Sequence, residues 1–169
     1  MNKKELNIEI PLTIFKKPKT TSPIQNPMIS KVYPKCDYIL NFDGCSKGNP
    51  GPAGIGAVIY NSGEEIWGSC QYIGKKTNNQ SEYSALILGL QEALSRDIKQ
   101  LQVYGDSLLV INQIKGIYKV NNKLLQDLYK EAMELVAKFE YIEFTHVYRK
   151  FNKRADQLSN LALDVLNES

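Results

Sequence analysis

Four acidic residues dominate the chemistry that this chain could perform, namely Asp43, Glu82, Asp106 and Asp156. Asp43 and Asp106 each follow an apolar segment with strand character, whereas the other two lie near the starts of predicted helices. Such positions gather at one end of an α/β sheet. Carboxylates that converge there without basic partners repel one another, so hard divalent cations are their expected ligands. Four of them around a phosphate would form a two-metal site for phosphodiester hydrolysis.

Each acid considered alone has a simpler structural explanation. Glu82 and Asp106 could be helix N-terminal residues that complement the helix dipole, and Asp156 could be a solvated surface residue. A cap does not need the polar run at residues 77–81, however, and these short side chains could contact a nucleic-acid backbone or base edge. The joint occurrence of the four acids therefore favours one shared site.

The segment that follows Asp43 is rich in glycine, with Gly44, Gly48, Gly51 and Gly54 in close succession. Glycine has no Cβ atom, so it lets a backbone pass close to a bulky ligand. A plain loop between two strands is the alternative. An aspartate at the end of a strand, followed by such a turn, favours the approach of a substrate.

His146 is the single histidine, expected at the end of the fifth strand and ten residues before Asp156. A lone strand histidine is often structural. Its functional role would be to carry a proton to or from the attacking water or the leaving oxygen, because imidazole titrates near neutral pH. The basic residues that follow would meet a phosphate or solvate a loop, and they are Arg149, Lys150, Lys153 and Arg154.

Hydrophobic periodicity predicts the elements that must position these residues. Three strands in a meander, followed by helix, strand, two helices, strand and helix, predict an α/β protein with a mixed sheet flanked by helices. The predicted strands cover residues 38–42, 53–60, 65–72, 100–104 and 141–147, and the predicted helices cover residues 83–94, 107–114, 125–136 and 158–165.

Residues 1–36 differ in composition from the rest of the chain. They hold five of the seven prolines and carry a net charge of +5, which leaves −2 on the remainder of a chain with net charge +3. We expect a flexible, basic, proline-rich arm before a folded domain at residues 37–169. The arm is either a solvated tail or a segment that contacts nucleic acid, or a partner protein through residues 8–12.

The composition favours an intracellular protein, in the cytoplasm or at sites of replication, that is neither secreted nor bound to a membrane. No apolar run is long enough to span a bilayer, and the N-terminus lacks a secretory apolar stretch. The three cysteines show no paired spacing and are expected to be reduced thiols. A monomer is the favoured oligomeric state.

Four ordered blocks around the acids resemble the type 1 ribonuclease H family. They are Asp43-Gly44-x-x-x-Gly48-Asn49-Pro50-Gly51-Pro52-x-Gly54, Asn78-Asn79-x-x-Glu82, Gly105-Asp106-Ser107 and Asn152-x-x-Ala155-Asp156-x-Leu158, within about residues 37–166. The resemblance implies a ribonuclease H-like fold whose five-stranded mixed sheet has the order 3-2-1-4-5. It also implies endonucleolytic cleavage of the RNA strand of RNA–DNA hybrids, giving 5′-phosphate and 3′-hydroxyl ends.

The resemblance assigns roles to individual residues. Asp43, Glu82, Asp106 and Asp156 match the family's metal-binding catalytic acids, which would hold two Mg²⁺ ions, with Mn²⁺ as a substitute. His146 lies at the same separation from the last aspartate as the family's catalytic histidine. The residues that would contact the hybrid are Gly44, Ser46, Asn49, Lys75, Thr77, Asn78 and Asn79.

Two departures from the family pattern bear on substrate binding and catalysis. The family's basic protrusion between its third and fourth helices is missing, since only residues 116–123 separate the helices here, as in the family's compact branch. The second departure is that His146-Val147-Tyr148-Arg149 is predicted to be strand and not a mobile loop, so that His146 could point away from the metals. In the compact branch an arginine at this strand end is thought to assist catalysis, so Arg149 is the rival of His146. The basic residues that could replace the protrusion are Lys115, Lys119, Lys123 and those of the N-terminal arm.

Two other functions stay open. A junction resolvase or a 3′-exonuclease could use the same fold, but the chain lacks an Asp-x-Glu pair on its first predicted strand. A non-catalytic hybrid-binding module is the second alternative, and the presence of all four acids argues against it.

Overall fold

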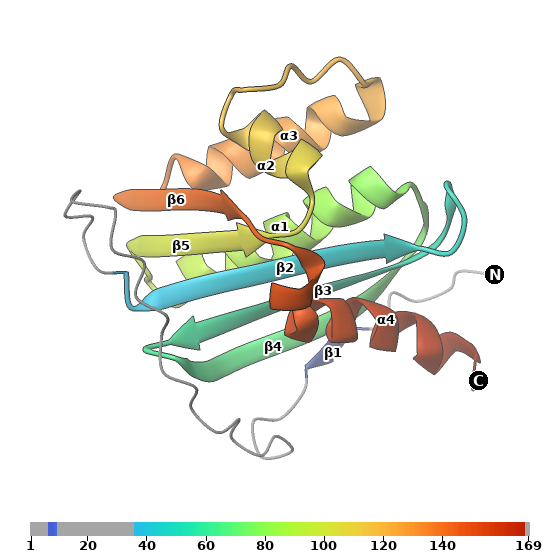
Figure 1. Cartoon of the computed structure of the whole chain (residues 1–169), viewed down its shortest axis with the longest axis horizontal. Coiled ribbons are helices and arrows are strands. Elements are labelled where there is room, and N and C mark those ends of the chain that lie inside the picture. Colours follow the sequence, from blue (N-terminus) through green and yellow to red (C-terminus); the bar gives the residue numbers. More distant parts are fainter. Residues whose placement is uncertain (1–6, 10–35, 168–169) are drawn as a thin grey trace.

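One mixed β-sheet forms the centre of the molecule in the computed structural model, which describes residues 7–9 and 36–167 (Figure 1). Its strands are β1 (Asn7–Glu9), β2 (Tyr38–Ser46), β3 (Gly51–Asn61), β4 (Glu64–Lys76), β5 (Gln100–Gly105) and β6 (Tyr141–His146). Their order across the sheet is β1-β4-β3-β2-β5-β6. β2, β3 and β4 form an antiparallel meander, and β5 and β6 continue the sheet parallel to β2.

Helices cover both faces of this sheet. They are α1 (Asn78–Ser95), α2 (Leu108–Ile114), α3 (Lys123–Val136) and α4 (Lys153–Asn167), with a short 3₁₀ turn, η2 (Arg149–Phe151), before α4. Figure 1 shows α4 in front of the sheet and α1 behind it. Successive residues of a strand face opposite sides, and accordingly Ala57 of β3 belongs to the core beneath α1, whereas Val58 belongs to the core beneath α4.

The apolar residues of α1 recur at helical spacing, and the side of the helix on which they lie is buried. Tyr83, Leu86 and Leu90 are fully buried against the sheet. The helix begins with a capping box, in which the Thr77 hydroxyl accepts from the amide of Gln80 and the Gln80 side chain accepts from the amide of Thr77. The cap fixes where the helix starts and hence where Glu82, in its second turn, is placed.

The five strands expected from the sequence are present in the expected order 3-2-1-4-5, which confirms the predicted fold. The predicted end of the first strand at residue 42 was wrong, because β2 runs on to Ser46. Its pairing with β3 continues through Asp43↔Gly56 to Ser46↔Ala53, whereas its pairing with β5 ends at Phe42↔Gly105. Asp43 is therefore the first residue of β2 beyond the parallel pair.

β1 is a sixth strand that the sequence analysis did not predict as part of the sheet. It pairs antiparallel with the outer edge of β4, with Ile8 opposite Cys70. It lies within the segment expected to be a flexible arm, and the rest of that prediction, at residues 1–6 and 10–35, falls outside the described residues. None of the helices in the described part of the chain has the length and apolar character needed to cross a bilayer.

The glycines of β2 and β3 let the helices approach the sheet closely. A Cβ atom at Gly56 would lie 2.6 Å from the carbonyl oxygen of Ala155, and one at Gly54 would lie 2.3 Å from that of Ser159, both in α4. A Cβ at Gly44 would lie 2.3 Å from the carbonyl carbon of Ser81 in α1. At Gly44 and Gly54 the missing side chain makes room for helix backbone. The predicted contact of the Gly44 backbone with a substrate stays a prediction.

Candidate active site

Three of the four predicted acids converge where β2 and β5 stop pairing. One carboxylate oxygen from each of Asp43, Glu82 and Asp106 lies within 4.8 Å of the others. Asp43 is part of β2, Glu82 comes from α1, and Asp106 directly follows β5. The parallel pairing of β2 with β5 brings the two aspartates to the same end of the sheet, and the close approach of α1 at Gly44 adds the glutamate.

Asp156 lies beside this cluster, at the start of α4. The hydroxyl of Ser159 is 2.8 Å from Oδ2 of Asp43 and 2.9 Å from the backbone oxygen of Asp156, so it links the two acids. The carboxylate of Asp156 accepts a hydrogen bond of 3.0 Å from Nη2 of Arg149. The structure therefore places the fourth acid next to Asp43 but not among the three oxygens that lie within 4.8 Å.

Two side-chain contacts hold the start of α4 against the sheet. The buried Asn152 donates from Nδ2 to the backbone oxygen of Phe42, at 2.9 Å. Arg154 forms a two-point ion pair with Glu65 of β4, with both N–O distances 3.0 Å. A guanidinium and a carboxylate fix each other's orientation in this geometry. The first turn of α4, which carries Asp156, is therefore held firmly against the sheet.

Burial shifts the titration of the three clustered acids upward. It raises the pKa of Asp43 to about 7, with a further rise from repulsion by Asp106 and an opposing effect of the Ser159 hydrogen bond. Burial and the charges of Asp43 and Asp106 raise the pKa of Glu82 well above its usual range. Burial also raises the pKa of Asp106. The cluster is therefore costly to ionise unless a cation neutralises it.

The donor set fits a divalent cation. All the ligand atoms that converge are carboxylate oxygens, which hard cations prefer. Among the described residues, Oε2 of Glu82 is buried and has no hydrogen-bond partner. A buried carboxylate oxygen without a donor is unfavourable, and a cation at the cluster would satisfy it.

A polar network joins the β2–β3 turn to the start of α1. The amide of Ser46 donates to Oδ1 of Asn78 at 3.0 Å, and the amide of Asn78 donates to Oδ1 of Asn49 at 3.0 Å. The Ser46 hydroxyl contacts the backbone oxygens of Lys76, at 2.8 Å, and of Gly48. Three predicted substrate-contacting residues, Ser46, Asn49 and Asn78, therefore form one connected surface.

The remaining predicted substrate-contacting residues lie around this network. Lys75 is exposed near the end of β4, and Asn79 is half-buried in the first turn of α1. Thr77 uses its hydroxyl oxygen to cap α1, so only its hydroxyl hydrogen is left to donate. The side of Gly44 that faces α1 is closed, which leaves only its backbone for a ligand.

The two candidate assisting residues differ in what they contact. Nε2 of His146 is 3.2 Å from the backbone oxygen of Asp106, and its ring makes an edge contact with Tyr148 at 5.8 Å between centroids. Arg149 contacts a carboxylate of the site directly, at Asp156. Arg149 is also largely exposed, with 74% of its side chain accessible, so it could contact a ligand while it stays paired.

Sequence reasoning missed Ser159 and the Glu65–Arg154 pair. Ser159 follows Asp156 by three residues, so a helical arrangement places both side chains on one face. That spacing was a usable signal. Nothing in the local sequence of β4, however, indicates that Glu65 would meet a residue 89 positions away.

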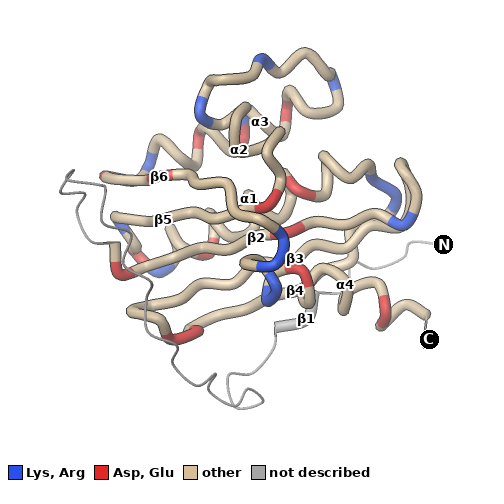
Figure 2. The backbone as a smooth tube through the Cα atoms, in the orientation of Figure 1, with Lys and Arg blue, Asp and Glu red and all other residues tan. Residues whose placement is uncertain are grey.

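Basic residues surround the acidic centre on the outside. Figure 2 shows Lys and Arg on the α2–α3 connection, beyond the end of β2 and at the start of α4, with Asp and Glu between them. This distribution suits a polyanion whose phosphates reach the acids through bound cations.

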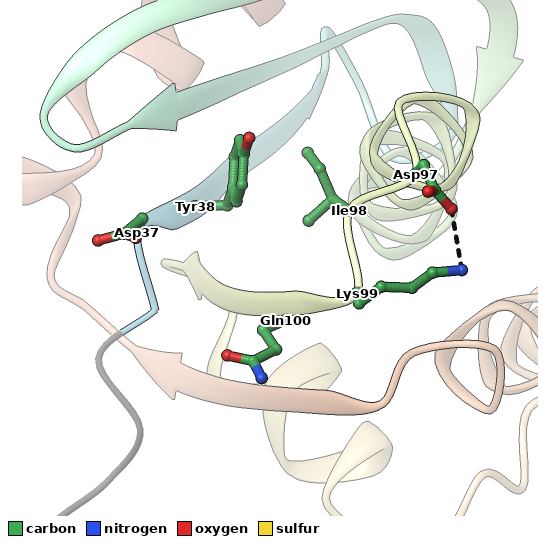
Figure 3. Close-up of a pocket in the computed structure, with 6 residues that line it drawn as sticks. All are labelled: Asp37, Tyr38, Asp97, Ile98, Lys99 and Gln100. Atoms are coloured by element: carbon green, nitrogen blue, oxygen red, sulfur yellow. Dashed lines mark ion pairs between the residues drawn. The ribbon is translucent and has the colours of Figure 1, made fainter.

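A shallow pocket of about 230 Å³ lies elsewhere, at the opposite end of the strands (Figure 3). Its lining includes Tyr38 at the start of β2, Gln100 at the start of β5, and the ion pair between Lys99 and Asp97 at 2.9 Å. Tyr38 and Asp43 are five positions apart on an extended strand, which corresponds to roughly 16 Å. The pocket is therefore not part of the acidic site.

Comparisons with known proteins agree with this fold and site. Residues 41–162 match the family model described as reverse transcriptase-like. The chain is 40% identical over 133 residues to a bifunctional protein of Mycobacterium tuberculosis. It is 41% identical to the crystal structure of RNase H1 from Halobacterium salinarum, with a TM-score of 0.73, over 75% of this chain and 97% of that chain. It is 36% identical to LC11-RNase H1 in complex with an RNA/DNA hybrid, with a TM-score of 0.72, over 76% and 98% of the two chains.

A mixed sheet in this order, with carboxylates where β2 and β5 separate, defines a protein of the ribonuclease H-like class. Within that class, the chain belongs to the type 1 ribonuclease H family. The match with the mycobacterial protein covers 78% of this chain but only 36% of that protein. The curated ribonuclease HI of Halobacterium salinarum is covered over 62% of its length.

Proposed function

We propose that this protein is an endoribonuclease that hydrolyses the RNA strand of RNA–DNA hybrids and leaves 5′-phosphate and 3′-hydroxyl ends. The observation that carries the proposal is the convergence of Asp43, Glu82 and Asp106 within 4.8 Å, with Asp156 next to them. A relative 36% identical to this chain is described in complex with an RNA/DNA hybrid, which supports the same substrate here.

The acids would hold two divalent cations, Mg²⁺ in the first place and Mn²⁺ as a substitute. When bound, these ions would supply the charge that activates water and stabilises the leaving oxygen. Asp43 and Glu82, both almost completely buried, would hold the cations at fixed positions. Asp106 and Asp156 are only half-buried and would complete the set on the side open to substrate.

The network of Ser46, Asn49 and Asn78 supports a role in strand selection. It joins the β2–β3 turn to the start of α1, the helix that carries Glu82. Polar groups at this place would hydrogen-bond the 2′-hydroxyl groups of a minor groove. The backbone of Gly44 and the side chain of Asn79 would extend this surface. Lys75 and Thr77 would bind a phosphate of the DNA strand, because the free hydrogen of the Thr77 cap can still donate.

Arg149 is the residue that we assign to assist the reaction. Its hydrogen bond to Asp156 keeps a positive charge beside the site, where it would meet the negative charge that develops on the phosphate. His146 would act as a proton carrier only if its ring turns away from the backbone oxygen of Asp106. The protein would act as an intracellular monomer, and the basic segment 1–36 would add contact with nucleic acid or a partner.

A cleavage assay tests the proposal. The wild-type protein should cut the RNA strand of a hybrid in the presence of Mg²⁺ or Mn²⁺, and leave RNA–RNA and DNA–DNA duplexes of the same sequence far less affected. Asp106→Asn should remove cleavage and keep the circular dichroism spectrum. Hybrid binding without cleavage by the wild type would instead support the non-catalytic alternative.

A further inference from the structure

The connection between β6 and α4 exposes two large aromatic side chains next to the acidic site. Tyr148 is 71% exposed and Phe151 is 63% exposed, the highest values among the large hydrophobic residues in the described part of the chain. A large aromatic side chain that stays exposed to water lacks the favourable free energy that its burial would provide. Two of them at one place favour a surface that is covered when a ligand binds.

The two rings project from one short turn. Phe151 donates its amide to the backbone oxygen of Tyr148 at 2.8 Å, and residues three apart in a 3₁₀ turn lie above one another. The edge contact with His146 restricts the Tyr148 ring on one side. Nζ of Lys150 lies 5.0 Å from the centroid of Phe151, so a positive charge lies over that ring. We refer to Tyr148, Lys150 and Phe151 together as the aromatic turn.

The aromatic turn is tied to the acids. Arg149, which lies between the two aromatic residues, is hydrogen-bonded to Asp156, and His146 contacts the backbone of Asp106. Residues 147–154 contain four basic residues and no acidic residue. A phosphate chain bound at the acids would therefore continue over a turn that offers positive charge and aromatic rings.

Exposed aromatic rings beside positive charge are a typical surface for single-stranded nucleic acid. Inside a duplex, both faces of each internal base are covered by the neighbouring bases, so a protein ring stacks more readily on a base that is unpaired. Because Arg149 contacts an acid that we assign to the scissile site, the strand that reaches the aromatic turn would be the one that is cut.

We propose that the aromatic turn stacks on an unpaired nucleotide of the RNA strand, so that the protein favours hybrids next to a single-stranded RNA segment. This inference rests on the proposed function, because it concerns the strand held at the same acids. The substrate class is thus the boundary between hybrid and unpaired RNA, in preference to hybrid that is fully paired.

The test compares hybrids that share one duplex and differ only in an extension. The RNA strand is blunt, or carries a short unpaired extension at its 5′ or 3′ end, or carries the same extension with abasic nucleotides. The wild type should cut one of the RNA-extended hybrids with a kcat/KM about 10-fold higher than that of the blunt hybrid. The abasic extension, or an unpaired extension on the DNA strand, should not produce this increase.

Variants assign the effect to the rings. The double variant Tyr148→Ala/Phe151→Ala should lower the ratio of kcat/KM between extended and blunt hybrids to about one. The double variant Tyr148→Phe/Phe151→Tyr keeps both rings and should keep the ratio, as should Leu161→Ala, which removes an exposed apolar side chain of α4. A ratio unchanged in the alanine double variant, or equal for normal and abasic extensions, would overturn the inference.

Binding can be followed without cleavage. In Asp106→Asn, a fluorescent base in the extension should be quenched when the hybrid binds, and the alanine double change added to this variant should remove the quenching. Cleavage of the blunt hybrid by the wild type tests the proposed function separately. If that cleavage is present and the extension has no effect, the inference fails and the proposed function stands.

Discussion

The hydroxyl oxygen of Ser159 lies 2.8 Å from Oδ2 of Asp43, although 116 positions separate the two residues in the chain. The same hydroxyl is 2.9 Å from the backbone oxygen of Asp156. Ser159 thus orients the buried acid of β2 and connects it to the backbone of the first turn of α4. The contact also favours the ionised form of Asp43, against the effect of burial.

Ser159→Ala should weaken cation binding and leave the fold intact. The lost hydrogen bond frees the Asp43 carboxylate to rotate, and removing such a supporting partner typically lowers metal affinity or activity about 10-fold or more. The Mg²⁺ concentration for half-maximal cleavage, or the heat of Mg²⁺ binding, measures the change. Ser95→Ala is the control, because Ser95 also bonds to its own helix but lies at the far end of α1. Equal Mg²⁺ dependence in both variants would contradict the assigned role.

Without cations, the stability of Asp43→Asn relative to the wild type should increase as pH rises. The pKa of Asp43 is raised from an ordinary value of 3.8 to about 7 in the folded protein. Between these values the unfolded chain has lost a proton that the folded protein keeps, so the wild type loses stability as pH rises through that range. The asparagine variant has no proton to lose at this position.

Thermal unfolding in the presence of a chelator, from about pH 4 to pH 8, measures this difference. The gap in Tm between variant and wild type should widen by several degrees towards high pH. Added Mg²⁺ should raise the Tm of the wild type more than that of the variant, because binding to the folded state stabilises it. Parallel pH profiles would show that Asp43 titrates normally.

Gly56→Ala should destabilise the protein by about 1–3 kcal/mol through overpacking. The added Cβ would lie 2.6 Å from the backbone of α4, at the Ala155 oxygen, so the helix must move away from β3. Asp156 belongs to that helix, so the rate of cleavage should fall as well. Gly74→Ala serves as a control for backbone strain alone, since its Cβ would meet nothing within 4 Å at a φ of 79°. A Gly56→Ala variant as stable and active as the wild type would show that α4 adapts freely.

Arg149→Gln should lower kcat on the order of 100-fold, in the range found when one donor to a developing charge is removed. Its stability should change by less than about 1 kcal/mol, because the pair with Asp156 is exposed on the arginine side. His146→Gln should have the smaller effect on kcat. Arg96→Gln, which breaks an exposed pair with Glu92 on α1, is the matched control. A larger loss in His146→Gln would assign the assisting role to the histidine.

Local sequence determined the identity of the acids and the order of the elements. The spacing of Tyr83, Leu86 and Leu90 predicted the buried side of α1, and alternation predicted the strands, because both patterns depend on residues that are close in the chain. The polar context of each acid was likewise local. Strand ends were less well predicted, as the continuation of β2 past Phe42 depends on its partner β3.

Only the tertiary structure decided how the acids are supported. The contact of Ser159 with Asp43, the ion pair of Arg154 with Glu65 and the helix backbone against Gly54 all join residues distant in the chain. Such contacts follow from the way α4 packs on the sheet, and no short-range pattern encodes that packing distance. For the same physical reason, the sequence did not indicate that Gly44 and Gly54 would lie against helix backbone.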